Sequence, residues 1–387
     1  MTDRTQPKDN QAQRLTLFLC GDVMTGRGID QILPHPAKPH LYEPYMRSAL
    51  SYVQLSEAAN GLIPRPVAFP YVWGDALAEF RRTGTDLRIV NLETAVTASE
   101  DAWPAKGINY RMHPANVPVL KAADIDCCVL ANNHVLDWGY AGLLETLDTL
   151  RGAGIAIAGA GRDAAEASAP AVLHVPKRGP GRVLVYAWGM ASSGVPREWA
   201  AGKKQPGVNF LDDLSARSLE AIARRIEAEK RPGDRVVASI HWGGNWGYGV
   251  TQEQRDFAHD LIDRAGVDVV HGHSSHHAKG IEVWHDRLIL YGCGDFVNDY
   301  EGIGGYEEYR GDLALMYFAS LDAADGRLSR LELVPTRTRR MRIERAPEEG
   351  RRWLMATLNR EGEPLGTRVE GQPTGELLVR WRPPDST

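Results

Sequence analysis

Short apolar runs that end abruptly in polar residues recur along the chain. Each is rich in Val, Ile and Leu and has the length of a buried strand. Six of them are LTLFLC (15–20), LRIVN (87–91), CCVLA (127–131), VLVYA (183–187), VVASI (236–240) and VDVV (267–270). A seventh run, RLILYGCG (287–294), leads into Asp295. The pattern predicts seven strands, each followed by a polar loop.

Segments with helical spacing lie between several of these strands, at residues 140–152, 213–229 and 251–266. In the last segment, Phe257, Leu261 and Ile262 share one helical face. Alternating strands and helices predict an α/β fold. Open α/β sheets bind ligands at the carboxyl ends of their strands, so functional residues are expected in the loops that follow the strands.

The rest of the chain suggests a main domain with additions. Residues 1–14 are polar and predict a disordered tail before a catalytic domain at 15–319. Residues 34–70, with scattered Pro and Tyr, predict an insertion that forms a lid or pocket wall. The pattern changes after residue 319, and residues 320–387, with a helix at 349–360, predict a small C-terminal appendage packed on the main domain.

Composition excludes several classes of protein. The formal net charge is −5, and the one basic run, residues 335–345, is typical of the wet face of a strand, so no nucleic-acid partner is expected. The chain has no signal region and no apolar stretch of about 18 residues, which predicts a cytoplasmic protein without a membrane partner. Four cysteines in apolar runs predict reduced thiols. The oligomeric state stays open.

Polar residues with metal-binding or acid–base chemistry follow most of the predicted strands. A mixed set of carboxylates, amides and imidazoles spread over several loops is typical of a divalent-metal site. The set consists of Asp22, Glu93, Asn133, His134, His241, His273, His276 and Asp295.

Six ordered motifs in these loops resemble those of the CapA-type family, named for poly-γ-glutamate capsule biosynthesis. The motifs are CGDVMTGRG, VNLETAVT, ANNHVLDWG, SIHWGGNWGY, GHSSHHAKGIEV and YGCGDFVND, and the resemblance covers roughly residues 15–317. It implies a calcineurin-like four-layer α/β/β/α sandwich, with the small C-terminal appendage added. Motif by motif, it implies metal-ligand positions at Asp22, Glu93, Asn133, His241 and His273, a general acid at His134, and a second histidine of the last motif at His276.

The chain departs from the related phosphoesterases at several positions. Met24 stands where those enzymes have a histidine, and a thioether cannot replace an imidazole for a hard divalent ion. Glu93 stands where an Asp is usual in those enzymes. Compared with CapA-type proteins, Asn245 stands where a Glu often follows HWG, and Asp295 stands where an Asn is common. We therefore expect one divalent ion, Ca²⁺, Mn²⁺ or Mg²⁺, rather than a tight two-metal centre.

Three classes of function fit this set of residues. Phosphoester hydrolysis follows from the fold, and hydrolysis of a γ-glutamyl-type bond follows from the family. A non-catalytic role in capsule or polymer assembly would use the fold as a binding platform. The third class is proton transfer at carbon, because the resemblance extends to relatives in lasso-peptide gene clusters that are implied to be epimerases.

Epimerisation of the C-terminal residue of a lasso-type precursor peptide is the specific prediction made here. Removal of a Cα proton requires charge stabilisation by a cation and a proton carrier on each face. Histidines tuned by carboxylates supply such carriers. We therefore predict a catalytic set of His134, His276, Asp295 and Asp22, without assigning which histidine is the acid and which the base.

A peptide substrate needs further contacts. Lys106 and Arg111 are candidates for binding a carboxylate. Aromatic residues in the loops after the strands predict an apolar pocket for a bulky side chain. The predicted pocket residues are Trp188, Trp242 and Trp246.

Overall fold

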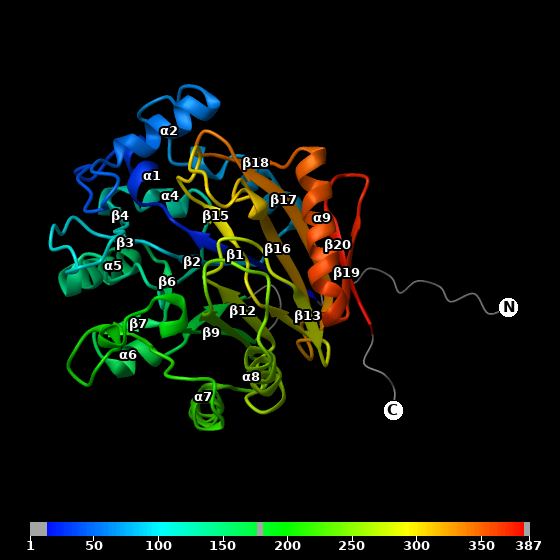
Figure 1. The fold of residues 1–387 in the computed structure, drawn as a ribbon. Helices are drawn as coiled ribbons and strands as arrows, with labels where there is room; N and C mark the ends of the chain where they lie inside the picture. The colour runs from blue at the N-terminus through cyan, green and yellow to red at the C-terminus, as the bar shows by residue number, and fades with distance from the viewer. Residues whose placement is uncertain (1–13, 176–180, 383–387) are drawn as a thin grey trace.

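The computed structural model describes residues 14–175 and 181–382, which form two main β-sheets (Figure 1). In these ranges the larger sheet has ten strands. Their order is β19 (Thr367–Gly371), β20 (Leu377–Trp381), β17 (Leu328–Thr338), β16 (Leu313–Asp322), β1 (Arg14–Val23), β2 (Leu87–Leu92), β5 (Cys127–Val129) and β6 (Ala156–Ala158), with β15 (Asp295–Val297) beside β1 and β18 (Ile343–Arg345) beside β17.

The second sheet has six strands in the described part of the chain. Their order is β13 (Ile281–Trp284), β14 (Arg287–Leu290), β12 (Val269–His273), β11 (Arg235–His241), β9 (Arg182–Gly189) and β8 (Ala171–His174). In both sheets the central strands run parallel, so their carboxyl ends lie at one edge. All seven predicted strands are confirmed: they correspond to β1, β2, β5, β9, β11, β12 and β14.

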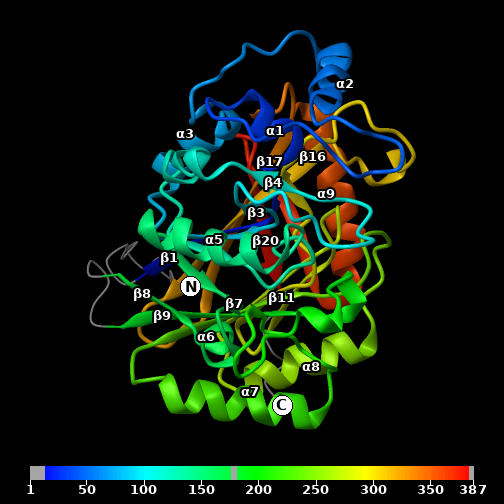
Figure 2. The same ribbon diagram turned by 90° about the vertical axis from the view of Figure 1, so that its left-hand side faces the viewer.

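The predicted helices are also confirmed, with small shifts at their ends. Residues 140–152 belong to α5 (Gly139–Gly152), and residues 349–360 to α9 (Glu348–Gly362). The helix expected at 213–229 is α7 (Ala216–Glu229), which starts later because Ser215 caps it. The helix expected at 251–266 is α8 (Gln252–Asp263), which begins after a capping box at Thr251. Figure 2 shows α7 and α8 together on the outer side of the six-stranded sheet.

Three hydrophobic clusters fill the molecule, because alternate residues of each strand point to opposite faces. In β1, Leu17 and Leu19 belong to a cluster shared with strands of the second sheet. Phe18 lies in a different cluster, with residues of the helices that follow β1, β2 and β5. The third cluster joins the second sheet to α7 and α8. These layers establish a mixed α/β fold with more than one sheet, while the specific calcineurin-like sandwich stays a prediction.

The C-terminal region continues the larger sheet. The predicted boundary between residues 319 and 320 lies inside β16, which pairs with β1 on one side and with β17 on the other. The antiparallel pair β16–β17 is followed by β20 and β19, and α9 packs beside them (Figure 1). The appendage was predicted as separate because its helix and strands follow a change of pattern, although tertiary pairing makes them part of one sheet. The predicted N-terminal tail, apart from Arg14, lies outside the described residues.

Three further features are the insertion at 34–70, the cysteines and the length and character of the helices. The predicted insertion at 34–70 contains α2 (Leu50–Asn60), which packs against α1 (Arg27–Ile32). All four cysteines are buried and unpaired, as predicted. Among the described residues, no helix combines the length and apolar character that a membrane crossing requires.

Candidate metal and acid–base site

Strand register brings the predicted ligands together at the carboxyl ends of the parallel strands. Asp22, at the end of β1, is the register partner of both Asn91 on β2 and Asp295 on β15. His241 and His273 end the neighbouring strands β11 and β12 and are register partners of each other. Since the ends of the two sheets meet here, groups from distant parts of the sequence share one buried cluster.

Asp22, His241 and His273 form its centre. A ligand atom of each lies within 4.8 Å of the others. The Nδ1 atoms of His241 and His273 are 2.7 Å apart. Asn133 Oδ1 lies 3.1 Å from His241 Nε2, and Glu93 Oε2 lies 4.0 Å from the same nitrogen. All five residues predicted as metal ligands therefore lie together, although their role as ligands stays a prediction.

Two buried carboxyl groups, Asp22 and Glu93, lie at this centre. Asp22 Oδ1 accepts a hydrogen bond of 2.8 Å from Asn91 Nδ2, but Asp22 Oδ2 is buried without a partner in the described structure. Burial, reinforced by the charge of Asp295, raises the pKa of Asp22 to about 7. Burial and the charge of Asp22 raise the pKa of Glu93 well above its usual value. An orphaned carboxylate oxygen among neutral imidazoles fits a divalent cation.

His241 and His273 are uncharged and offer nitrogen lone pairs to a bound ion. Burial lowers the pKa of His241 and of His273 well below the usual value, and each is lowered further by neighbouring histidines. Both rings are therefore neutral at pH 7, as metal ligands must be.

A His–Asp pair lies on one side of this centre. His134 Nδ1 is 2.7 Å from Asp137 Oδ2, and His134 Nε2 is 3.7 Å from Glu93 Oε1. Burial lowers the pKa of His134 to about 4, against the opposing effect of Asp137. Because the Asp137 carboxylate accepts the Nδ1 proton, Nε2 carries a lone pair directed toward the centre, as in a general base.

A second His–Asp pair lies on the other side. His276 Nδ1 is 2.8 Å from Asp295 Oδ1, and these two residues with Asp22 form another group whose ligand atoms lie within 4.8 Å of one another. Burial opposes protonation of His276, but the charge and hydrogen bond of Asp295 raise its pKa overall. Asp295 therefore gives His276 a carboxylate partner.

A cavity of about 730 Å³ lies beside the cluster. His276 lines it directly, and so does Tyr110, whose ring packs edge-on against His134 at 4.5 Å. The cavity thus contacts His276 of one His–Asp pair directly, while the Tyr110 ring lies between the cavity and His134 of the other pair.

The insertion and one Gly-rich loop supply much of the cavity wall. Tyr45, Met46 and Tyr52 come from the predicted lid at 34–70, and residues 302–307 come from the loop that follows β15. Glu301 joins the two parts, because its carboxylate accepts hydrogen bonds from Ser56 and Asn60 of α2. Residues of the insertion therefore line the cavity, and the role of the insertion as a lid stays a prediction.

Lys106 and Arg111, which were predicted to bind a substrate carboxylate, both contact groups of the protein itself. Lys106 Nζ lies 3.1 Å from Asp137 Oδ1 and so supports the first His–Asp pair. The Arg111 guanidinium donates to the Ser99 and Lys38 carbonyls and stacks on Trp138 at 3.8 Å. The structure does not bring Arg111 to the cluster, because its donors are needed to hold two loops together.

Only one of the three predicted pocket tryptophans lines the cavity. Trp246 does so, stacked on Tyr306 at 3.9 Å and packed against His276 at 5.3 Å. Trp188 and Trp242 are instead buried in the cluster formed with α7 and α8. Both lie near the end of a strand. There, a shift of one residue along the strand turns a side chain from one face of the sheet to the other, and so from the pocket to the core.

Several residues of the site were not predicted. Asp137 orients His134, and it could have been found three positions after that histidine in the motif ANNHVLDWG. Buried Arg27 lines the cavity and bonds Asp299 and, from the insertion, Glu43. Arg27 had no local signal beyond its place in the motif CGDVMTGRG. Met24 is buried beside the site and accepts a hydrogen bond of 3.4 Å from Tyr300.

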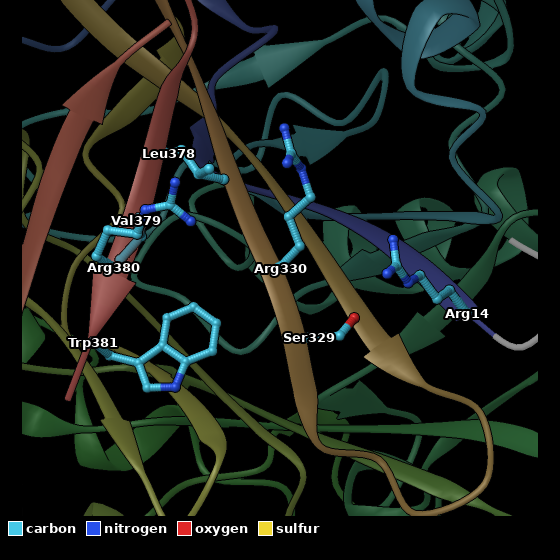
Figure 3. Close-up of a pocket in the computed structure, with 7 residues that line it drawn as sticks. All are labelled: Arg14, Ser329, Arg330, Leu378, Val379, Arg380 and Trp381. Carbon is cyan, nitrogen blue, oxygen red and sulfur yellow. The ribbon is translucent and has the colours of Figure 1, made fainter. Parts of the chain in front are cut away.

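A separate cavity of about 390 Å³ lies on the larger sheet, over β1, β17 and β20 (Figure 3). Arg330 and Arg380 line it and are bonded to Glu332 and Glu370. It contains none of the candidate residues.

Comparison with known families gives one match that covers most of the chain. Residues 16–300 match the model of PGA_cap, described as bacterial capsule synthesis protein. This range contains every residue of the cluster and of both His–Asp pairs.

Two named relatives add detail. The chain is 48% identical to the "Probable polyglutamine synthesis accessory protein" of Mycobacterium tuberculosis, over 94% of this chain and 96% of the relative. It is 25% identical to the capsule biosynthesis protein CapA of Bacillus anthracis, over 76% of this chain and 62% of CapA. A solved structure of GAP50, the anchor in the inner membrane complex of Plasmodium, aligns over 94% of this chain at a TM-score of 0.36 and 9% identity.

Proposed function

Because the chain belongs to the bacterial capsule synthesis protein family PGA_cap, we propose that it is a metal-dependent enzyme that hydrolyses an amide bond in a glutamate- or glutamine-containing chain. One observation carries this proposal: an Asp–His–His cluster adjoins two His–Asp pairs, and His276 of one pair lines a cavity. The name of the Mycobacterium tuberculosis relative, an accessory protein of polyglutamine synthesis, supports this substrate class.

Asp22, His241 and His273 would hold one divalent ion, with Asn133 and Glu93 beside them. The bound ion supplies Lewis acidity to a carbonyl oxygen. Two features favour the binding of one ion rather than two. Met24 offers no imidazole at its position, and His276 Nδ1 is already bonded to Asp295.

The two His–Asp pairs divide the proton transfers. His134 Nε2 accepts a proton from the attacking water, while Asp137 holds Nδ1 and stabilises the imidazolium that forms. His276 donates the proton at Nε2 to the leaving nitrogen as the C–N bond breaks, while Asp295 holds its Nδ1. A new carboxylate and a free amine result.

Epimerisation at Cα is the second candidate, and the same two His–Asp pairs favour it. One neutral histidine and one histidine that favours protonation could serve the two faces of a Cα. We rank it below hydrolysis because the relative's name points to polymer synthesis rather than to a lasso-type peptide. A non-catalytic accessory role and phosphoester hydrolysis are further outcomes that the experiment separates.

The test uses the purified protein with Mn²⁺ and synthetic α- and γ-linked glutamate and glutamine oligomers. We expect one bound ion per chain and release of amine groups from at least one oligomer. His134→Asn keeps a donor for Asp137 but lacks Nε2, so the rate should fall at least about 100-fold. His285→Asn is the matched control, because His285 forms a similar pair with Asp263 at the surface, and its rate should be unchanged.

Other results would point elsewhere. Deuterium at Cα after incubation in D₂O, without amine release, would favour epimerisation. Phosphate release from an aryl phosphate would favour a phosphoesterase. Binding of an oligomer by the metal-loaded protein, with no chemical change, would contradict hydrolysis and favour the accessory role.

A further inference from the structure

A line of buried polar groups runs behind His273 and ends on the other sheet. His271 Nε2 lies 2.7 Å from the backbone carbonyl oxygen of Cys20 on β1. His271 Nδ1 lies 3.1 Å from Ser239 Oγ on β11. Ser239 Oγ in turn lies 2.8 Å from His273 Nε2. Neither Ser239 nor His271 belongs to the proposed ligands, and both are fully buried.

The chemistry of each group fixes the direction of these hydrogen bonds. A carbonyl oxygen only accepts, so His271 Nε2 carries a proton and donates it to Cys20. The His271 ring contacts no carboxylate in the described structure and is therefore neutral, with a lone pair at Nδ1. The Ser239 hydroxyl must donate to that lone pair. Its oxygen is left as an acceptor toward His273, so His273 carries its proton on Nε2 and a lone pair on Nδ1.

His241 completes the argument on the other side. With the Asn133 amide oriented as in the structure, Oδ1 faces His241 Nε2, which must donate to it. The Nδ1 atom of His241 is then also unprotonated, and it faces Nδ1 of His273 at 2.7 Å. Two lone pairs at this distance repel each other unless a cation lies between them. Asp22 Oδ2, which has no partner among the described residues, belongs to the same cluster.

We propose that Ser239 and His271 are positioning residues that fix His273 as the Nε2–H tautomer and so present its Nδ1 lone pair to a divalent transition metal. The inference rests on the proposed metal site and goes beyond it, because it names the groups that set the protonation state of a ligand. The Cys20 carbonyl belongs to the larger sheet and His273 to the other. We call the hydrogen-bonded chain from the Cys20 carbonyl through His271 and Ser239 to His273 the relay. It couples the tautomer of His273 to the packing of the two sheets.

The first measurement is the tautomer itself. In the metal-free wild-type protein, ¹⁵N–¹H multiple-bond spectra of the histidine rings should show His273 and His271 with the proton on Nε2. In Ser239→Ala, His273 should become a mixture of the two tautomers. His273 with the proton on Nδ1 in the wild-type protein would overturn the proposal, whatever any variant does.

The second measurement is Mn²⁺ affinity by calorimetry. Loss of a group that orients a ligating histidine typically weakens metal binding 10- to 100-fold, so Ser239→Ala should raise the dissociation constant by about that factor. Thr336→Val is the matched control: it removes a buried strand hydroxyl that has no partner in the described structure, and the affinity should not change. Equal affinities of Ser239→Ala and wild type would also overturn the proposal.

These results are separable from the fate of the proposed function. A wild-type protein that binds Mn²⁺ with the stated tautomer but releases no amine would overturn the hydrolase while supporting the relay. A wild-type protein that binds no Mn²⁺ would overturn the metal site and with it the role of the relay as a positioning device.

Discussion

At the scale of single residues, Asp22 combines full burial with a carboxylate charge. Its carboxylate is the register partner of Asn91 and Asp295, lies beside two neutral imidazoles, and has one oxygen without a partner in the described structure. In the metal-free protein this conflict between burial and charge destabilises the folded state. A cation bound at the cluster would remove it.

Asp22→Asn should therefore stabilise the metal-free protein in a pH-dependent way. The folded-state pKa of Asp22 is raised to about 7 from an ordinary value of 3.8, so the wild-type protein loses stability as the pH rises from about 4 to about 7. The asparagine does not ionise, and the gain should reach a few kcal/mol at neutral pH. Urea denaturation in the presence of a chelator measures the difference.

Added Mn²⁺ should reverse the order of stability. It should raise the melting temperature of the wild-type protein and leave that of Asp22→Asn nearly unchanged, since the variant lacks the central carboxylate. A gain for Asp22→Asn that does not depend on pH would show that the wild-type carboxyl is not the source of the strain.

At the scale of elements, the close approach of β1 to the segment before β15 positions Asp22 beside Asp295. A Cβ at Gly21 would lie 1.5 Å from the Gly294 carbonyl oxygen, so only glycine permits this approach. The Asp22 backbone N–H donates to the same carbonyl at 2.9 Å. The two strand ends are thus locked together directly beneath the cluster.

Gly21→Ala should separate these strand ends and lower stability by about 3 kcal/mol, the upper range for overpacking a buried position. Mn²⁺ affinity should fall with it, because Asp22 and Asp295 move apart. Gly152→Ala, at the end of α5 with open space around it, is the control: it should leave the affinity unchanged and should not lower stability, because alanine favours the helix. Thermal melting and calorimetry provide the two measurements, and an unchanged affinity in Gly21→Ala would contradict this account of the site.

The tether of the insertion is a second feature at this scale. Glu301 accepts from Ser56 and Asn60 of α2 and from the backbone N–H groups of Arg340 and Met341. Ser56→Ala with Asn60→Ala should accelerate amide hydrogen exchange in α2, since the helix loses its side-chain contacts to the cavity wall. Exchange in α7, on the far sheet, should not change. Equal exchange in α2 would show that its apolar contacts alone hold it.

At the scale of the whole molecule, buried neutral histidines couple folding to pH. Burial lowers the pKa of His134, His271 and His277 to about 4, and it lowers those of His241 and His273 well below the usual value. As the pH falls, the unfolded chain binds these protons near 6.5 while the folded protein does not. Stability present above pH 6.5 should therefore be lost between about pH 6.5 and 4.

Groups whose folded-state pKa is raised oppose this trend, because the folded protein binds their protons at a higher pH than the unfolded chain does; Asp22, Glu93 and His276 are among them. We expect the five histidines to outweigh these groups, since all five are protonated in the unfolded chain early in this pH range. Urea denaturation of the metal-free protein at pH 7.5, 6.5, 5.5 and 4.5 should show a falling free energy of unfolding. A free energy that rises or stays level across this range would mean that the histidines are not buried in solution as they are in the structure.

The sequence by itself determined the strands, the main helices and the family. Each apolar run had the length of a buried strand, and the polar residue at its end marked the edge where ligands bind. Local signals such as the capping box at Thr251 set the start of a helix within a few residues. Asp22, Asn133, His241 and His273 could therefore be assigned to one edge before their distances were known.

Only the tertiary structure decided which of these groups touch and which neighbours are available. Trp188 and Trp246 were both predicted to line the pocket, yet Trp188, inside β9, is packed in the core, while Trp246, in the loop after β11, lines the cavity. From the sequence alone, Arg111 is a candidate for binding a substrate carboxylate. In the structure its guanidinium donates to two loop carbonyl oxygens. The pairing of Asp22 with Asp295, and the relay from Cys20 through His271 to His273, join residues separated by about 250 to 270 positions. Such contacts arise from the packing of one sheet on another, and no local pattern encodes them.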